Sequence, residues 1–180
     1  MSALLLNLML MACSGDIETK ESDTAGDSLP VQTELPELYI NEFMASNTTT
    51  LADEAGEFDD WMELYNGGDT LVSMDGIYLT DDDKDKTQWA IPSSQGLAPG
   101  DFMIIWCDGT PNQGEMHTSF KLNKGGDKLL LYKVESGHQA ARIDGVEWST
   151  EQPDLAAARV PDGSDNWVHQ AGTPGESNGG

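Results

Sequence analysis

Positive charge is scarce in this sequence. Only 9 of its 180 residues are Lys or Arg, against 32 Asp or Glu, and the formal net charge is −23. A nucleic-acid surface needs Lys or Arg to replace the counterions of each bound phosphate, and attachment to anionic lipid also needs basic side chains. The composition therefore argues against a protein that binds nucleic acid or that adheres electrostatically to a membrane surface.

Cysteines and helical patterns are also scarce. The two cysteines, Cys13 and Cys107, allow one disulfide at most, which excludes a small domain held together by disulfides. After the first 12 residues, no window longer than ten residues carries an apolar stripe of helical period. The 5 Trp, 4 Tyr and 4 Phe are nevertheless too many for a disordered chain. We therefore expect a folded domain without long helices.

Sequence motifs of catalysis are lacking as well. There is no Gly-x-Ser-x-Gly, His-Glu-x-x-His or Cys-x-x-Cys motif, and no glycine-rich phosphate loop before a helix. His117, His138 and His169 lie in separate segments, so we expect surface histidines and no zinc site. Pairs of acids are frequent, but a two-carboxylate glycosidase also needs a cleft that keeps one carboxyl protonated. The sequence predicts a protein that is not an enzyme.

The N-terminal segment looks like a targeting signal. Residues 1–12, MSALLLNLMLMA, are almost wholly apolar, yet they are too few to span a bilayer, which takes about 20 residues. Leu10-Met11-Ala12-Cys13 resembles the lipobox of bacterial lipoproteins, although no Lys or Arg precedes the apolar run. This resemblance implies that Cys13 carries lipid and becomes the mature N-terminus. The alternative is an ordinary hydrophobic N-terminus with a free thiol at Cys13.

An acidic spacer follows. Residues 14–37 contain seven acidic side chains against Lys20, separated by Ser, Thr, Gly and Pro, and such a composition keeps a chain extended. We therefore predict a signal peptide over 1–12, a lipid-anchored disordered linker over 13–37 and a folded domain over 38–180. The expected location is the cell envelope, at the outer membrane or cell surface and facing away from the cytoplasm, with membrane contact through the lipid only; secretion is the alternative.

From Leu38 onward, short apolar runs alternate with turn residues such as Asp75-Gly76 and Gly125-Gly126. The runs are four to eight residues long and rich in Ile, Val, Leu, Tyr or Trp, which favours strands of an antiparallel sandwich or barrel. Asp154–Ala158 is expected to form one helical turn at most. The predicted strands are Leu38–Met44, Trp61–Tyr65, Thr70–Ser73, Ile77–Thr80, Gln88–Ile91, Phe102–Cys107, Lys128–Val134, Ala141–Trp148 and Asn166–His169.

Two of these runs are almost continuously apolar. Asp101–Cys107 is predicted to be a central strand, or one whose outer face is covered by a loop, and Lys128–Lys133 is predicted to be its neighbour. On this basis Ile104 is expected to lie in the core. Cys107 is expected to be a buried, inert thiol, without a disulfide partner if Cys13 is lipidated.

Several segments resemble the lamin tail domain family. The residues that carry the resemblance are Ile40–Asn47, Asp60–Asn66, Gly76–Asp82, Leu97–Gly100, His117–Leu122, Arg159–Gly163 with Asn166-Trp167, and Gly172–Gly175. The resemblance covers residues 38–178 and implies an immunoglobulin-like β-sandwich. It implies no catalytic residues. Heptad repeats and a basic localisation run are absent, so the resemblance is to bacterial members on secreted and surface proteins and not to nuclear lamins.

The acidic residues cluster in the first half of the domain. Residues 42–86 hold 13 acids and two lysines, a net charge of −11, and oxygen-rich loops of this kind can bind Ca²⁺. The Asp81-x-Asp83-x-Asp85 spacing is similar to the start of a calcium loop, but Lys86 and Pro92 replace the Gly and Glu of an EF-hand. A solvated acidic surface is the alternative. The candidate ligands are Asp53, Glu57, Asp59, Asp81, Asp83 and Asp85.

The five tryptophans fall about one per predicted strand, as expected of a sandwich core, and Trp148 and Trp167 are the least certain to be buried. Exposed tryptophans could instead stack against sugars. The sequence thus predicts a noncatalytic, surface-anchored domain for adhesion, recognition or envelope scaffolding, with an unidentified protein or glycan partner and no cofactor other than Ca²⁺. The alternatives are a carbohydrate-binding or Ca²⁺-dependent module and, third, an enzyme or hydrolase accessory.

Overall fold

The computed structural model describes residues 34–179, which form eleven strands and no helix. The predicted signal peptide, Cys13 and most of the predicted acidic linker lie outside the described residues. No helix in the described part is long and apolar enough to span a membrane. The strands are β1 (Leu38–Met44), β2 (Trp61–Asn66), β3 (Val72–Ser73), β4 (Ile77–Thr80), β5 (Trp89–Ala90), β6 (Gly96–Leu97), β7 (Phe102–Trp106), β8 (Asp127–Lys133), β9 (Ala141–Trp148), β10 (Ala156–Arg159) and β11 (Trp167–Gln170).

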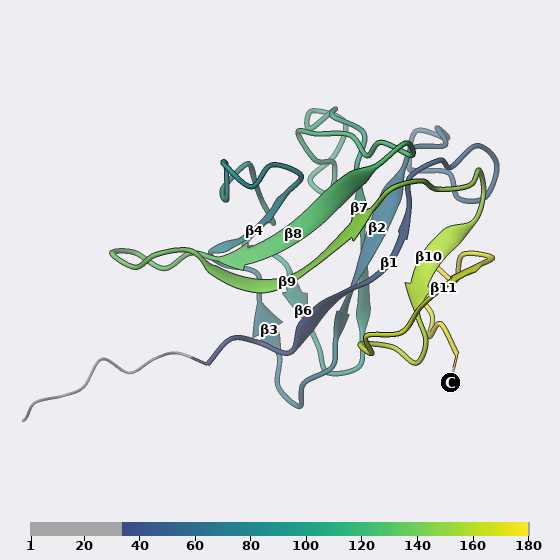
Figure 1. Cartoon of the computed structure of the whole chain (residues 1–180). Coiled ribbons are helices and arrows are strands. Elements are labelled where there is room, and N and C mark those ends of the chain that lie inside the picture. Colours follow the sequence, from purple (N-terminus) through teal and green to yellow (C-terminus); the bar gives the residue numbers. More distant parts are fainter. Residues whose placement is uncertain (1–33, 180) are drawn as a thin grey trace, which may run out of the picture. The chain divides into compact units, whose positions relative to one another are not determined.

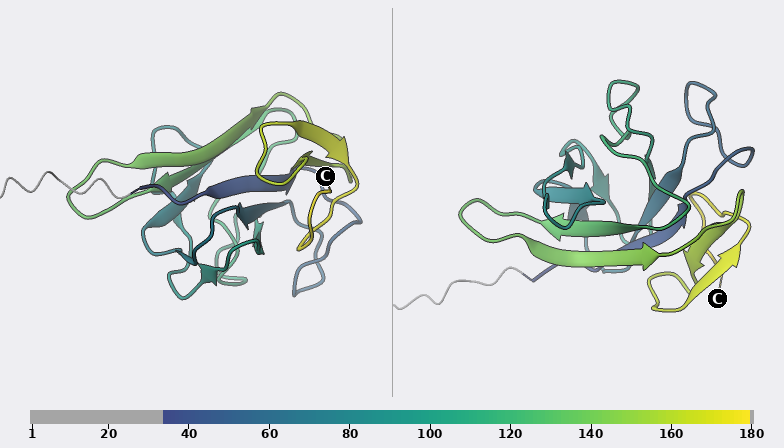
Figure 2. Two further views of the ribbon diagram at one scale, coloured as in Figure 1. Left: turned by 90° about the horizontal axis from the view of Figure 1, so that it is seen from below. Right: turned by 45° about the horizontal axis from the view of Figure 1, so that its top comes forward.

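The strands form two facing antiparallel sheets (Figures 1 and 2), and in the view of Figure 1 the sheet with β8 and β9 lies in front of the sheet with β1 and β2. One sheet has the order β11-β10-β1-β2-β7 and the other the order β5-β4-β8-β9, while β3 and β6 form a short separate pair. This arrangement confirms the prediction of an all-β, immunoglobulin-like antiparallel sandwich.

The core lies between the two sheets and is built mainly from alternate residues of the strands, with the alternation in β1 shifted by one residue between Ile40 and Glu42. Ile40 and Phe43 of β1 and Leu64 of β2 face Leu129 and Leu131 of β8, and all five are buried. Burying an aliphatic or aromatic side chain of this size contributes about 1.5–3 kcal/mol. The alternation of apolar and polar residues in the sequence is therefore the pattern that assembles the sandwich.

Three expectations about strands were wrong. Ala156–Arg159, where no strand was expected, form β10, which pairs with β1 and β11. All four residues of β10 are buried, and three consecutive alanines fit there because their small side chains allow close approach of neighbouring layers. The expected pairing of β7 with β8 is also wrong, since β7 pairs with β2 and β8 lies in the other sheet.

The third correction concerns the position of β7. Among the named strands it pairs only with β2, so it is an edge strand and not a central one. Its other edge is partly covered by the following segment, because the Trp106 N–H donates to the carbonyl of Met116 and Thr118 N–H donates back to Trp106. Ile104 is only partly buried, whereas Ile105 is fully buried in the core. The alternative, a strand covered by a loop, describes β7 better.

Part of the outer face of the five-stranded sheet is also apolar. Met44, Trp61, Trp106 and Ala156 form a second buried cluster, covered by Leu51 of the β1–β2 loop. The long β1–β2 loop is thus held against the sandwich by its own apolar contact.

Cys107, directly after β7, is a buried free thiol, as expected, and burial raises its pKa well above the usual value.

Candidate functional site

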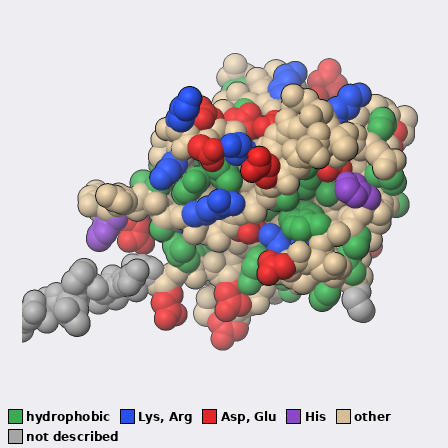
Figure 3. Space-filling view, in the orientation of Figure 1, with side chains coloured by type: hydrophobic (Ala, Val, Ile, Leu, Met, Phe, Trp, Pro, Cys, Tyr) green, Lys and Arg blue, Asp and Glu red, His purple; other side chains and the backbone are tan. Residues whose placement is uncertain are grey.

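A hollow opens at the edge of the sandwich, between β9 of one sheet and the β10–β11 pair of the other. It has a volume of about 200 Å³. Figure 3 shows hydrophobic side chains reaching the surface in this region. Its lining is Phe43, Val146, Glu147, Trp148, Glu151, Ala157, Trp167 and His169.

Three aromatic rings form the apolar part of the hollow. The Phe43 ring lies beneath, with its centroid 4.4 Å from that of Trp148 and 5.7 Å from that of Trp167. The Trp148 indole N–H donates to the carbonyl of Asn123 at 3.0 Å, and the guanidinium of Arg159 lies 4.6 Å from the Trp167 ring centre. These contacts fix both indoles in place, so the hollow is formed in advance of any ligand.

Polar side chains flank the aromatic rings. The Glu151 carboxylate accepts a hydrogen bond from His169 Nε2 at 2.8 Å, although the Glu151 side chain is 4% exposed and that of His169 is 48% exposed. Glu147 is exposed beside them. Because the site combines apolar rings with carboxylate acceptors and an imidazole, it can contact a small ligand that has one apolar face and several hydroxyl groups.

A second group of functional side chains lies in the β1–β2 loop. Among the predicted calcium ligands, Asp53, Glu57 and Asp59 come together, with one carboxylate oxygen of each lying within 4.8 Å of the others. Asp53 Oδ1 accepts the backbone N–H groups of Ala55 and Glu57, which closes the loop on itself. Burial, with the charges of Asp108 and Asp53, raises the pKa of Asp59.

The other three predicted ligands do not join this group. Asp81, Asp83 and Asp85 lie in the β4–β5 loop, and none belongs to a cluster with metal-binding geometry within residues 34–179. The Asp83 carboxylate pairs instead with Lys128 of β8. The side-chain oxygens of Asp82 and Asp85 accept backbone N–H groups within their own loop. The structure therefore divides the six residues between two loops.

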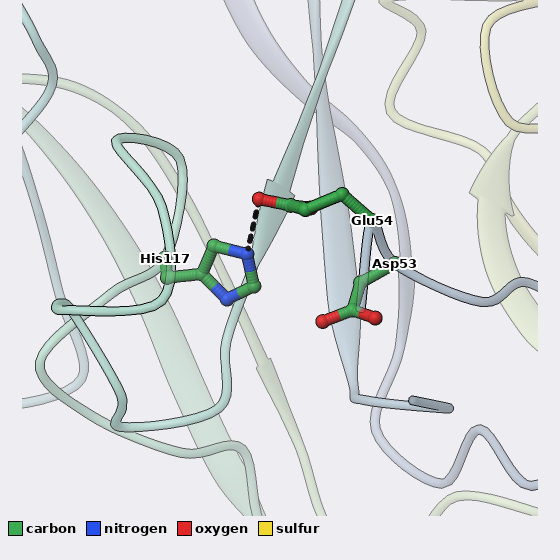
Figure 4. A group of neighbouring side chains, drawn as sticks. All are labelled: Asp53, Glu54 and His117. Atoms are coloured by element: carbon green, nitrogen blue, oxygen red, sulfur yellow. Dashed lines mark hydrogen bonds and ion pairs between the residues drawn. The ribbon is translucent and has the colours of Figure 1, made fainter. Parts of the chain in front are cut away.

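His117 was wrongly expected at the surface. It is fully buried, with Nδ1 2.9 Å from Asp108 and Nε2 3.1 Å from Glu54 of the β1–β2 loop (Figure 4). Burial by itself would lower the pKa of His117, but the hydrogen bonds and charges of Asp108 and Glu54 raise it. No spacing pattern predicts this arrangement, since Glu54 and His117 are 63 residues apart in the sequence. His138 and His169 are exposed, as expected.

Comparisons with known proteins identify a family for most of the chain. The Lamin Tail Domain family profile matches residues 32–150, about two thirds of the sequence. Neither curated protein sequences nor solved structures gave a match. The matched range contains β1 to β9 and the acidic loop, whereas β10, β11 and the segments Arg159–Gly163 and Gly172–Gly175 lie beyond it.

Proposed function

We propose a recognition function for this chain, which belongs to the lamin tail domain family, an immunoglobulin-like family that is generally noncatalytic. In this proposal the chain is a noncatalytic domain of bacterial type, displayed on the cell envelope through a lipid at Cys13 and the acidic linker. Its partner is a glycan, bound in the hollow between β9 and β11. Adhesion to a glycan-coated surface would be the biological consequence.

The observation that carries the proposal is the aromatic hollow. Two indole rings from different sheets, Trp148 and Trp167, are only partly buried and share a lining with Phe43. Core aromatics in the rest of the sandwich, such as Trp61 and Trp89, are buried. An indole face that remains accessible can stack against the C–H face of a sugar ring.

The charged side chains that line the hollow favour the binding of a neutral sugar over that of an acidic one. Glu147 and Glu151 both line the hollow, and the only basic group there is the imidazole of His169, which already pairs with Glu151. Arg159 contacts Trp167, but the residue is 4% exposed and its guanidinium bonds to Asp144. A carboxylated or phosphorylated glycan would therefore meet like charge, whereas sugar hydroxyl groups can donate to the exposed carboxylate of Glu147.

A glycan array probed with the full-length protein tests this function. We expect binding to a small set of neutral glycans, retained by Phe58→Ala and lost by Trp167→Ala. Phe58 is the matched control because it is a 47% exposed aromatic in the β1–β2 loop, away from the hollow. Circular dichroism spectra of both variants should match that of the natural protein, as a check that they are folded. An array without any bound glycan, or equal binding by both variants, would contradict the proposal.

A further inference from the structure

We infer that the protein binds one divalent transition-metal ion, of the type of Zn²⁺, through His117, Asp53 and Glu54. The three side chains come from two loops at one end of the sandwich, and Figure 4 shows their functional groups turned toward one another. One ligand atom of each lies within 4.8 Å of the others. The site is independent of the aromatic hollow and does not depend on the proposed glycan function.

The buried imidazole is the central observation. The Asp108 carboxylate accepts the backbone N–H of Thr110 through Oδ1, and its Oδ2 lies 2.9 Å from His117 Nδ1. Because a carboxylate can only accept a hydrogen bond, His117 Nδ1 carries the proton. This fixes the ring and directs Nε2 toward Glu54 and Asp53. A metal-binding histidine is oriented in the same way, by a carboxylate on its other nitrogen.

The distance between two of the ligand atoms fits a shared ion. Zn²⁺ binds imidazole nitrogen and carboxylate oxygen at about 2.0–2.2 Å, so two of its ligands lie roughly 3–3.5 Å apart. His117 Nε2 and Glu54 Oε1 are 3.1 Å apart. The ion would replace the proton on Nε2, which leaves to solvent, and a small movement of Asp53 would complete a third bond.

Glycine at position 114 makes room for this arrangement. A Cβ atom there would lie 2.4 Å from Glu54 Oε1 and 2.8 Å from His117 Cδ2, which is closer than real Cβ contacts. The glycine therefore allows the Glu54 carboxylate to reach the imidazole. Adjacent Gln113 donates from its side-chain amide to both Asp53 and Glu57, which holds the two loops in register.

Negative charge around the imidazole is in excess. Asp108 and Glu54 contact the imidazole, Asp53 belongs to its ligand group, and Glu57 and Asp59 cluster with Asp53. Across residues 34–179 no Lys or Arg forms an ion pair with any of these five carboxylates. Asp59 also has a buried side-chain oxygen without a hydrogen-bond partner. Glu57 and Asp59 share the second ligand group with Asp53, so they are the nearest source of a fourth ligand.

The donor set favours a transition metal over calcium. Ca²⁺ takes oxygen ligands, whereas imidazole is a preferred ligand of Zn²⁺ and its neighbours in the first row. The proposed site thus differs from the Ca²⁺ site expected from the sequence. His117 anchors it, and Glu54, absent from the predicted ligands, takes part. The bound ion would fasten the β1–β2 loop to the segment that covers β7.

Titration calorimetry with ZnCl₂, in the presence of excess CaCl₂, tests the site on the full-length protein freed of metal by a chelator. Glu54→Gln is the informative variant because this side chain is 58% exposed and its loss does not threaten the fold. Glu115→Gln is the matched control, an exposed acid two residues from His117 that belongs to neither ligand group. Nitrogen NMR of the His117 ring reports directly on metal bound at Nε2.

We expect one Zn²⁺ per chain for the natural protein and for Glu115→Gln, with affinity lower by about tenfold or more in Glu54→Gln. The Nε2 resonance of His117 should shift on addition of Zn²⁺, while that of Nδ1 should move little. Absence of binding, equal affinity in both variants, or displacement of Zn²⁺ by CaCl₂ would overturn the inference. In each of those cases the group is an ion-paired histidine and nothing more.

Discussion

Glu42 of β1 and Glu63 of β2 are paired directly across the two strands, and both side chains are fully buried. The C-terminal segment covers them: the Thr173 N–H donates to both oxygens of Glu42 at 3.1 Å, and the Gly175 N–H donates to Glu63. Burial raises the pKa of Glu42 from 4.5 to about 7 and that of Glu63 from 4.5 to about 8. At neutral pH this pair therefore holds at least one proton.

The carboxyl pair predicts stability that falls as the pH rises. A folded-state pKa above the unfolded value means that the contribution of each group is fully present below pH 4.5 and is lost as the pH rises through about 7 for Glu42 and about 8 for Glu63. The free energy of unfolding should fall by at most about 1.4 kcal/mol per pH unit for each group within that window. Thermal melts across the window measure this directly.

Two variants test whether the carboxyl pair causes this pH dependence, one changed within the pair and one changed at a distant exposed position. Glu63→Gln should flatten the dependence on pH and melt higher than the natural protein at alkaline pH, because the amide cannot ionise. Glu147→Gln, at an exposed position, should leave the profile unchanged. A profile that rises with pH, or that is the same in all three proteins, would show that the pair is not protonated in the folded state.

Two adjacent residues of β7 should respond differently to the same substitution. Ile105 is fully buried between the sheets, so Ile105→Asp should cost more than about 4 kcal/mol and abolish folding. Ile104 faces the outer side and is only partly buried, so Ile104→Asp should cost about 1–3 kcal/mol and leave a folded protein. Urea unfolding curves compare the two, and equal losses would contradict the assignment of faces.

Arg159 should be a strong determinant of stability because it links the two sheets. From β10 its guanidinium donates to the Ile40 carbonyl at 2.8 Å and to both oxygens of Asp144 in β9 at 3.1 Å. Lys cannot reproduce this planar fork, so Arg159→Lys should destabilise the fold by about 3 kcal/mol. Arg142→Lys, at an exposed position of β9, should cost under about 0.5 kcal/mol in the same denaturation measurement.

The proposed anchor can be tested by expression of the full gene in a bacterium. We expect the natural chain to fractionate with membranes, since acyl chains contribute about 0.8 kcal/mol per buried CH₂ group, and Cys13→Ala to be released into the soluble fraction. Metabolic labelling with a fatty acid should mark only the natural chain. A natural chain that is soluble and unlabelled would contradict lipidation at Cys13.

Strand alternation made most of the fold predictable. The predicted ranges Leu38–Met44, Ile77–Thr80 and Ala141–Trp148 agree with the structure at both ends, because each is a short apolar-rich run flanked by turn residues. Within the first and the last of these ranges a register shift interrupts the alternation. β10 was missed because Ala-Ala-Ala has high helix propensity, and only burial between β1 and β11 makes it a strand. Strand neighbours were also missed, since hydrophobicity does not show which of two sheets a strand joins.

The candidate sites were predictable only in part. The cluster of acids within residues 53–59 is local in sequence, so its three carboxylates could be foreseen together. The contact of Glu54 with His117 depends on how two loops meet after folding, which no local pattern records. Trp148 and Trp167 lie next to predicted turns and were the tryptophans least certain to be buried, and both are only partly buried. Their position in one hollow could not be predicted, because it depends on how β9 and β11 meet in the fold.

The most direct test of the recognition function is a nitrogen–proton NMR titration of the five indole N–H groups with a glycan selected on the array. If the glycan binds in the hollow, we expect the resonances of Trp148 and Trp167 to shift in a saturable manner, while those of the buried Trp61, Trp89 and Trp106 do not change. If the resonances of Trp148 and Trp167 stayed unchanged while the glycan bound, the hollow would not be the binding site, and the proposed recognition function would be contradicted.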